Sequence, residues 1–118
     1  MNGRIKLPDR RPSFTKRGVW LTETSEHRFH LTLGVHPETG AILEVFYADG
    51  QRTGSGLQHA IQDACVLVSL LLQHGVSPDE IGKSLSTAPV FGTERAATVV
   101  GVIVDLVKEG IGADDAPD

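Results

Sequence analysis

Residues 54–75 read GSGLQHAIQDACVLVSLLLQHG, and this stretch decides the fold because it predicts one helix whose two ends are both specified. Ser55 is a good N-cap residue, and Gln58 follows three positions later, as in a capping box. Gly75 supplies the left-handed residue that ends a helix. From residue 65 to 72 all but one of the side chains are apolar, so we expect the second half of this helix to be buried on nearly every side. The rest of the chain must therefore pack against both of its flanks.

Length and composition indicate one soluble domain. The chain has 118 residues, an apolar fraction of 40% and a formal net charge of −4. This length can bury a core without disulfides, and this charge is typical of neither a strongly basic nucleic-acid binder nor a disordered acidic protein. The single cysteine, Cys65, excludes an internal disulfide and a cysteine-built zinc site, so we expect a cytoplasmic protein. The basic N-terminal residues are not followed by an apolar run, so we predict no signal peptide. The apolar runs elsewhere are too short to span a membrane.

The charge is unevenly distributed along the chain. Six of the first 17 residues are lysine or arginine, against one aspartate. We interpret residues 1–15 as a basic extended arm and residues 16–110 as a single α+β domain. The last eight residues, 111–118, contain three aspartates and no base, and we expect them to form an acidic tail without fixed structure.

Three strands are predicted before the central helix. Residues 16–22 are rich in β-formers, and residues 28–35 alternate cleanly between apolar and polar side chains. Residues 36–40 contain proline and glycine, as a hairpin turn does, and a third alternating run covers residues 41–48. The simplest arrangement is an antiparallel meander with one face on the core.

Two more helices are predicted after the central one. Ser77 is followed by a proline and then by Glu80, which indicates an N-cap with a capping box, and this short helix ends near Leu85. Residues 86–92 read as a loop, and Thr93 then caps a helix from 94 to 109. The predicted fold class is α+β: a three-stranded antiparallel meander followed by three helices, with the central helix packed on the sheet.

The first and last of these helices carry more apolar surface than a three-stranded sheet can cover. A homodimer that buries part of the central or the last helix would remove the excess, so we expect a homodimer.

The glycine-rich turn before the central helix is a candidate anion site. Backbone N–H groups at the start of a helix attract anions, and a basic residue lies beside them in the sequence. The pattern is neither a Walker loop nor a dinucleotide fingerprint, and a tight turn without a ligand is the alternative interpretation. The candidate anion-binding residues are Arg52, Gly54, Ser55 and Gly56.

A nucleic-acid surface is the second candidate site. The basic arm, together with one face of the sheet, offers positive charge near Phe14 and Trp20. A solvated tail is the alternative interpretation of the arm. The candidate nucleic-acid-binding residues are Arg10, Arg11, Lys16, Arg17 and Arg28.

Metal binding and catalysis find little support in the sequence. His59 and Asp63 lie four residues apart on one helical face, but two ligands are fewer than a metal site needs. His27 and His30 have odd spacing on a strand and therefore face opposite sides. Cys65 lies in the apolar half of the central helix, where a thiol is usually inert. We predict no catalytic residue, no metal and no cofactor.

Several stretches resemble the TSCPD domain, which occurs at the C-terminal end of adenosylcobalamin-dependent (class II) ribonucleotide reductases and as a small stand-alone module. The similarity runs from about Leu7 to about Val107, and its most specific part lies between Leu67 and Leu85. The stretches that carry it are LPDRRP at 7–12, EVF at 44–46, GSGL at 54–57 and VSLLLQHGVSPDEI at 68–81.

The departures from this family pattern bear on function. A chain of this length lacks the catalytic barrel, the redox cysteines and the cobalamin site of the reductases. The cysteine-containing motif that names the family corresponds here to Ser86-Thr87-Ala88-Pro89, which has no cysteine. The resemblance therefore implies the fold and a non-catalytic accessory or regulatory binding role. A nucleic-acid-binding protein and a nucleotide or phosphate sensor at residues 54–56 are the alternatives.

Overall fold

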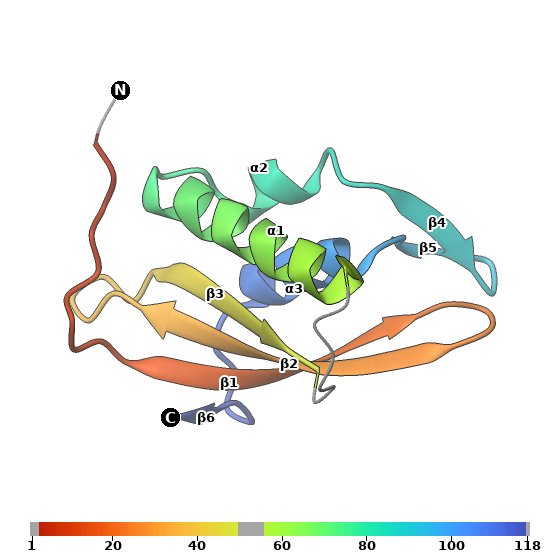
Figure 1. Ribbon diagram of the computed structural model, residues 1–118, viewed down its shortest axis with the longest axis horizontal. Coiled ribbons are helices and arrows are strands. Elements are labelled where there is room, and N and C mark those ends of the chain that lie inside the picture. The colour runs from red at the N-terminus through yellow and green to blue at the C-terminus, as the bar shows by residue number, and fades with distance from the viewer. Residues whose placement is uncertain (1–2, 50–55, 118) are drawn as a thin grey trace.

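One antiparallel sheet carries the fold, and the helices cover a single face of it (Figure 1). The computed structural model describes residues 3–49 and 56–117. Its sheet has the strand order β3-β2-β1-β6. The bounds are β1 Ser13–Leu21, β2 Glu26–Val35, β3 Ile42–Ala48 and β6 Ala116–Pro117. The predicted meander of β1, β2 and β3 is confirmed, with each strand within three residues of its predicted ends.

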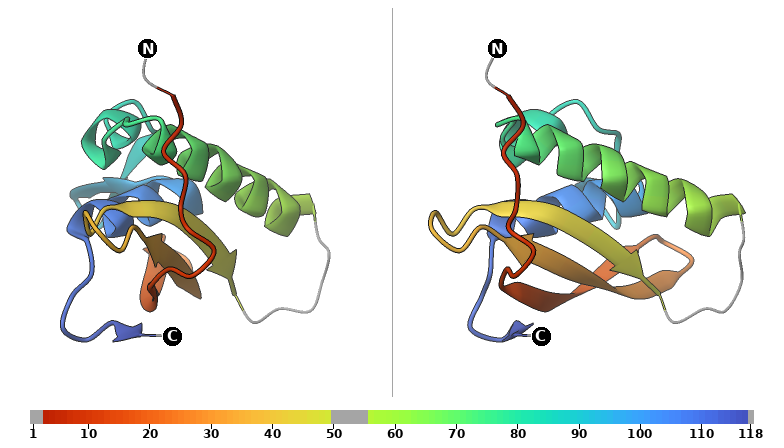
Figure 2. Two further views of the ribbon diagram at one scale, coloured as in Figure 1. Left: turned by 90° about the vertical axis from the view of Figure 1, so that its left-hand side faces the viewer. Right: turned by 60° about the vertical axis from the view of Figure 1, so that its left-hand side comes forward.

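Alternation along the strands separates a core face from an open face. Phe29, Leu31 and Leu33 on β2 are almost fully buried, and so is Val45 on β3. The intervening residues point away from the helices, because successive side chains of a strand face opposite sides. Figure 2 shows the helices on one side of the sheet and no helix on the other.

Helix α1, Gly56–Gln73, packs along β3 and is the predicted central helix. It ends as the sequence predicts. Gly75 has a φ of +86°, and its N–H donates to the Leu72 carbonyl while the N–H of Val76 donates to the Leu71 carbonyl. This pair of bonds is a Schellman motif. The predicted N-cap, Ser55, lies outside the described residues.

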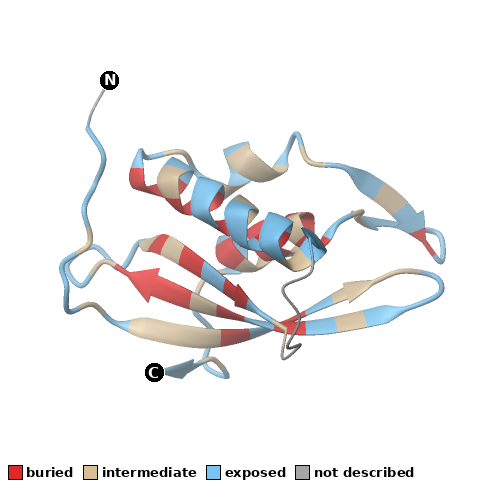
Figure 3. Cartoon of the chain, in the orientation of Figure 1, coloured by how far each residue is buried: buried red, intermediate tan, exposed pale blue. Residues whose placement is uncertain are grey.

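The other two helices pack beside α1. Helix α2, Pro78–Gly82, has the predicted cap, in which Ser77 Oγ accepts from the N–H of Glu80 at 3.1 Å, but it is shorter than predicted. Helix α3, Val99–Glu109, contacts β1 and α1 and buries Ile103 and Val104. Figure 3 shows buried stretches on the helices and on the strands that they face. Lys108 Nζ lies 2.7 Å from Asp79 Oδ1 and links α3 to α2.

The prediction that α3 begins at residue 94 is wrong, and so is the prediction of a loop over residues 86–92. A second hairpin occupies this region, with β4 at Thr87–Val90 and β5 at Thr93–Ala96. Phe91 and Gly92 both have positive φ, as a two-residue type I′ turn requires. Strand pairing overrides the helix-forming tendency of residues 94–96, and the actual cap of α3 is Thr98, whose Oγ accepts from the Gly101 N–H.

The two hairpins meet at their tips. The Phe91 N–H donates to Glu23 Oε2 at 3.0 Å, and Glu23 lies in the turn between β1 and β2. Figure 1 shows the β4–β5 hairpin extending from the helices toward this turn. Val90 is buried behind the contact, whereas the Phe91 side chain is exposed.

The described parts of both terminal segments lie against the domain. The backbone N–H of Ile5 donates to the Gln73 carbonyl at 2.7 Å, which fixes the arm at the end of α1 (Figure 2). At the other end, where we expect a tail without fixed structure, residues 116–117 pair with β1 at Phe14 and Thr15. The tail follows this course because a buried lysine, described below, requires its carboxylate.

Candidate functional site

The candidate anion site falls mostly outside the described residues. Arg52, Gly54 and Ser55 are not described, and Gly56 is the exposed first residue of α1. Anion binding at this loop therefore stays a prediction.

The arm arginines have different environments. Arg11 forms a bidentate pair with Glu44 on β3, with Nε–Oε1 at 2.7 Å and Nη2–Oε2 at 2.9 Å. The Glu44 hydrogen bond raises the pKa of the Arg11 guanidinium. Arg10, next to it, is exposed. Arg11 thus holds the arm on the sheet, and Arg10 stays a predicted nucleic-acid contact.

Lys16 is not at the surface, which corrects its assignment as a nucleic-acid contact. It lies opposite Leu31 on the core face of β1 and is 6% exposed. Its Nζ donates to the Gly110 carbonyl at 3.0 Å and to Asp115 Oδ2 at 3.1 Å. A buried ammonium group needs such partners, and the tail supplies them.

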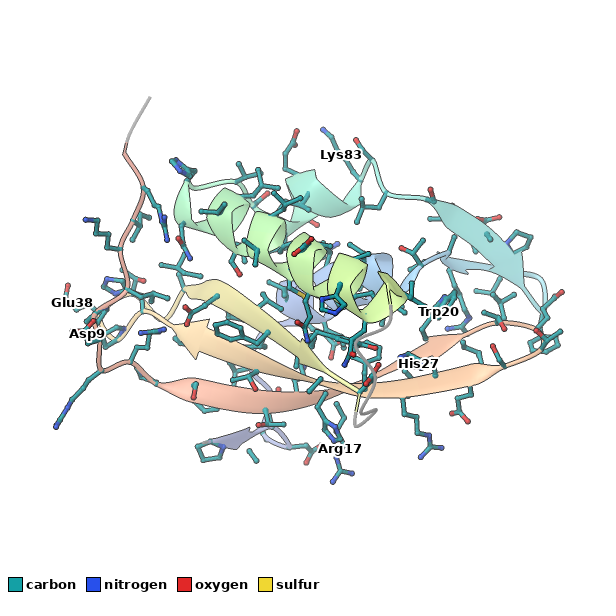
Figure 4. The ribbon with its side chains drawn as sticks, viewed as in Figure 1. Asp9, Arg17, Trp20, His27, Glu38 and Lys83 are labelled. Carbon is teal, nitrogen blue, oxygen red and sulfur yellow. The ribbon has the colours of Figure 1, made fainter. Side chains whose placement is uncertain are left out.

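Arg17 and Arg28 lie on the open face of the sheet. Arg17 is opposite His30, and Arg28 is two residues before His30 on the same strand. Figure 4 shows Arg17 pointing away from the helices. Phe46, 53% exposed, lies on the same face of β3. We call Arg17, Arg28, His30 and Phe46 the open-face cluster. It contains only two of the five basic residues predicted to act together.

A partly buried chain of polar side chains that sequence reasoning missed joins β2 to the end of β3. Tyr47 Oη donates to Asp49 Oδ2 at 2.9 Å and lies 2.7 Å from His27 Nε2. Because the hydroxyl has one proton and gives it to Asp49, His27 must donate its Nε2–H to Tyr47. Burial, together with the Asp49 carboxylate, raises the pKa of Tyr47 well above its ordinary value. No local pattern predicts these contacts, since His27 lies twenty residues before Tyr47 in the sequence.

The polar side chains on the buried side of α1 bind the edge of the sheet. Ser69 Oγ accepts from the Val45 N–H at 2.9 Å, and Gln73 Nε2 donates to the Leu43 carbonyl at 2.9 Å. Arg4 on the arm donates to the Gln73 side-chain oxygen. These hydrogen bonds hold α1, β3 and the arm together, and the polar groups that form them are already bonded within the protein.

Cys65 is buried on the same helix. Burial raises the pKa of its thiol to about 11, so the thiol is protonated at neutral pH. This agrees with the interpretation of Cys65 as packing rather than as a nucleophile.

Metal-ligand geometry is not found in the described residues. His59 and Asp63 are both exposed on α1. Across residues 3–49 and 56–117, no three histidine, cysteine or acidic side chains lie close enough to share an ion.

The solvent-facing side of α1 carries several large apolar side chains. Leu57, Val66, Leu67 and Leu71 are all exposed there. None of the helices in the described part of the chain is long and apolar enough to cross a membrane.

Comparison with known proteins gives one consistent result. The TSCPD domain profile matches residues 4–112. The vitamin B12-dependent ribonucleotide reductase of Bradyrhizobium diazoefficiens (strain USDA 110) is 35% identical over 115 residues, which cover 92% of this chain and 9% of that protein. The chain therefore spans less than a tenth of the length of this relative. No solved structure is significantly similar to the chain.

Proposed function

We propose a function for this chain from one premise: the chain belongs to the TSCPD domain family. We propose that it is a non-catalytic accessory or regulatory module that binds a vitamin B12-dependent ribonucleotide reductase and works as a homodimer. The observation that carries the proposal is how much of each protein the match covers. Nearly the whole chain aligns with a segment that makes up 9% of such an enzyme.

The environments of its reactive side chains support binding rather than catalysis. The Cys65 thiol is buried and protonated at neutral pH, and the Ser69 hydroxyl is engaged with the backbone of β3. The exposed features are instead two surfaces of the kind that contact other macromolecules: the open-face cluster and the apolar side of α1.

Purified Bradyrhizobium diazoefficiens enzyme tests the proposal. We expect the chain to bind the enzyme saturably in isothermal titration calorimetry and to change the rate of ribonucleotide reduction. An enzyme variant without the segment that matches this chain is the control, since a module that occupies the position of that segment should bind this variant more tightly. The absence of both binding and a rate effect would contradict the proposal.

The open-face cluster favours nucleic-acid binding as a second candidate function. Arg17 and Arg28 lie near one another, and an exposed aromatic ring, Phe46, lies on the same face of the sheet. Positive charge and aromatic rings are the combination that binds single-stranded nucleic acid, through backbone neutralisation and base stacking. Binding to labelled RNA and DNA should weaken steeply as salt rises.

A matched control separates this cluster from general charge effects. The double variant Arg17→Ala, Arg28→Ala should abolish binding, whereas Arg95→Ala, an exposed arginine on β5, should leave it nearly unchanged. An equal loss of nucleic-acid affinity in the two variants would argue against a site on the open face.

A further inference from the structure

The outer side of α1 carries an apolar stripe with a regular spacing. Its leucines Leu57, Leu67 and Leu71 are 70%, 62% and 42% exposed. Ala60 and Ala64 lie between them, exposed and half-buried respectively. Successive members are three or four residues apart, which places all five on one line along the helix. We call Leu57, Ala60, Ala64, Leu67 and Leu71 the α1 stripe.

The helix around the stripe carries almost no charge. Over its 18 residues α1 has one carboxylate, Asp63, and neither lysine nor arginine. A helix face that stays in water is normally charged or polar. Single exposed leucines are ordinary at a protein surface, but several aligned on one uncharged line are typical of a contact surface.

We propose that the α1 stripe packs against the α1 stripe of a second copy of the chain, with the two helices antiparallel about a two-fold axis at Ala64. The proposal rests on the homodimer of the proposed function and names its interface. A two-fold interface requires a surface that is complementary to itself, so that residue i meets residue j and residue j meets residue i.

The stripe meets this requirement. Leu57 and Leu71 each lie seven residues from Ala64, so they come opposite one another in the antiparallel pair. Ala60 lies four residues before Ala64 and Leu67 three residues after it, so a large side chain faces a small one. Ala64 faces its own copy, where a small side chain lets the two backbones approach closely. The spacing alternates between three and four residues, as helices that cross at about 20° require.

The area available sets the strength of the dimer. A stable interface buries about 800 Å² on each partner. The 18 residues of α1 form a stripe about 27 Å long, at 1.5 Å per residue, which supplies only part of that area. We therefore expect a reversible dimer with a micromolar Kd rather than an obligate one.

Two neighbouring residues give a matched test. Leu67 and Val66 are both exposed, by 62% and 56%, but they point about 100° apart on the helix. Sedimentation equilibrium from low-micromolar to near-millimolar concentration should show the wild type passing from monomer to dimer. Leu67→Glu should raise the Kd at least about a hundredfold, because it buries two unpaired carboxylates at the interface. Val66→Glu should dimerise like the wild type.

The orientation has its own test. Under mild oxidation Ala64→Cys should form a disulfide between two copies, since the two-fold axis brings the two thiols together. Gln62→Cys, exposed on another side of α1, should not, and the buried Cys65 leaves the wild type unlinked. Crosslinking of Ala64→Cys also tests the proposal if Leu67→Glu fails to fold.

The possible failures are distinguishable. A wild-type dimer that Leu67→Glu leaves intact, or equal crosslinking of the two cysteine variants, would overturn the α1 interface but not dimerisation. A monomeric wild type at every concentration would overturn both. Binding to the reductase is measured separately and decides the accessory role by itself.

Discussion

At the scale of single residues, Gly18 sets how closely α3 approaches the sheet. A Cβ atom there would lie 2.4 Å from Phe29 Cζ and 2.8 Å from Leu106 Cδ1. Phe29 belongs to the core and Leu106 to α3. Because Gly18 has no side chain, Phe29 and Leu106 can both pack over β1 at this position. The sequence does not reveal this, because it shows a glycine within a strand but not which side chain fills its place.

Gly18→Ala should therefore destabilise the fold by about 1–3 kcal/mol through overpacking. Urea denaturation followed by circular dichroism measures the change. Gly3→Ala is the control, since a Cβ at Gly3 meets nothing within 4 Å, and it should change stability by less than about 0.5 kcal/mol. Equal stabilities for the two variants would mean that α3 can shift away from β1 at no cost.

The Cys65 thiol gives a pH dependence with a defined sign. The unfolded chain loses this proton near the ordinary pKa of 9.0, whereas the folded chain keeps it until about 11. Between these values the folded state binds more protons, so stability should fall as pH rises from 9 to 11, by about 2 kcal/mol in all. Cys65→Ala removes this contribution and not that of Tyr47. Urea denaturation at several pH values should thus give a smaller loss for Cys65→Ala, and parallel curves would refute the assignment.

At the scale of elements, the hydrophobic pattern predicted the parts whose partners are near in sequence. One run rich in β-formers, two alternating runs and one capped helix predicted β1, β2, β3 and α1. It failed for residues 93–96. Their mostly polar side chains are compatible with a helix, but the segment forms a strand because β4 pairs with it. It also failed for residues 116–117, since a two-residue strand has no periodicity to detect.

The candidate site was predicted less well than the fold. A basic residue looks the same in a sequence whether it is exposed, as Arg17 is, or buried, as Lys16 is. What decides between them is the position of Asp115, 99 residues away along the chain. In the structure the pleat of β1 puts Lys16 on the core face. Residues 16–22 have apolar side chains at both odd and even positions, so the sequence alone did not indicate this face.

The tail itself carries the third prediction. Asp115 accepts from the Gly112 N–H at 2.7 Å and from Lys16, and these two bonds lower the pKa of its carboxyl group, the Gly112 bond most. Asp115→Asn would leave the buried ammonium of Lys16 without this charge, at a cost of about 1–3 kcal/mol. We also expect faster amide hydrogen exchange in the tail. Asp114→Asn, an exposed neighbour, should behave like the wild type.

The contacts of Asp115 also predict how the stability of the fold changes at low pH. A carboxyl group whose pKa is lowered in the folded state stabilises the fold above its unfolded pKa, near 3.8, and loses this contribution as pH falls through the folded pKa. The protection factors of the tail amides, which compare their exchange rates with those of the unfolded chain at the same pH, should therefore fall toward those of Asp115→Asn only in strong acid. Protection factors already that low at neutral pH would contradict the ion pair.

At the scale of the whole molecule, the N-terminal arm connects the two layers. It pairs with Glu44 on the sheet through Arg11 and with Gln73 at the end of α1 through Arg4 and the Ile5 N–H. Figure 2 shows the arm crossing from the sheet to the helices at one end of the molecule. Basic composition suggested an arm for binding other molecules, but two of its arginines bind the protein itself.

The arm gives the fourth prediction. Arg11→Ala should release the arm and speed exchange of the Ile5 amide at least about tenfold, because that amide is protected only while the arm is docked. Arg10→Ala removes the same charge from the neighbouring exposed residue and should leave the exchange unchanged. NMR-detected hydrogen exchange measures both, and an equal effect would mean that net charge, not the Glu44 pair, holds the arm.

The bonds from α1 to β3 also bear on how the protein behaves when it is concentrated. An uncovered outer strand offers its backbone to any other chain and is a common starting point for aggregation. Here Ser69 and Gln73 already occupy the outward N–H of Val45 and the outward carbonyl of Leu43. A foreign strand that tried to add at these positions would have to displace a packed helix first. Two polar side chains, which look like interruptions in an apolar helix, thus protect the protein against fibril growth from that side.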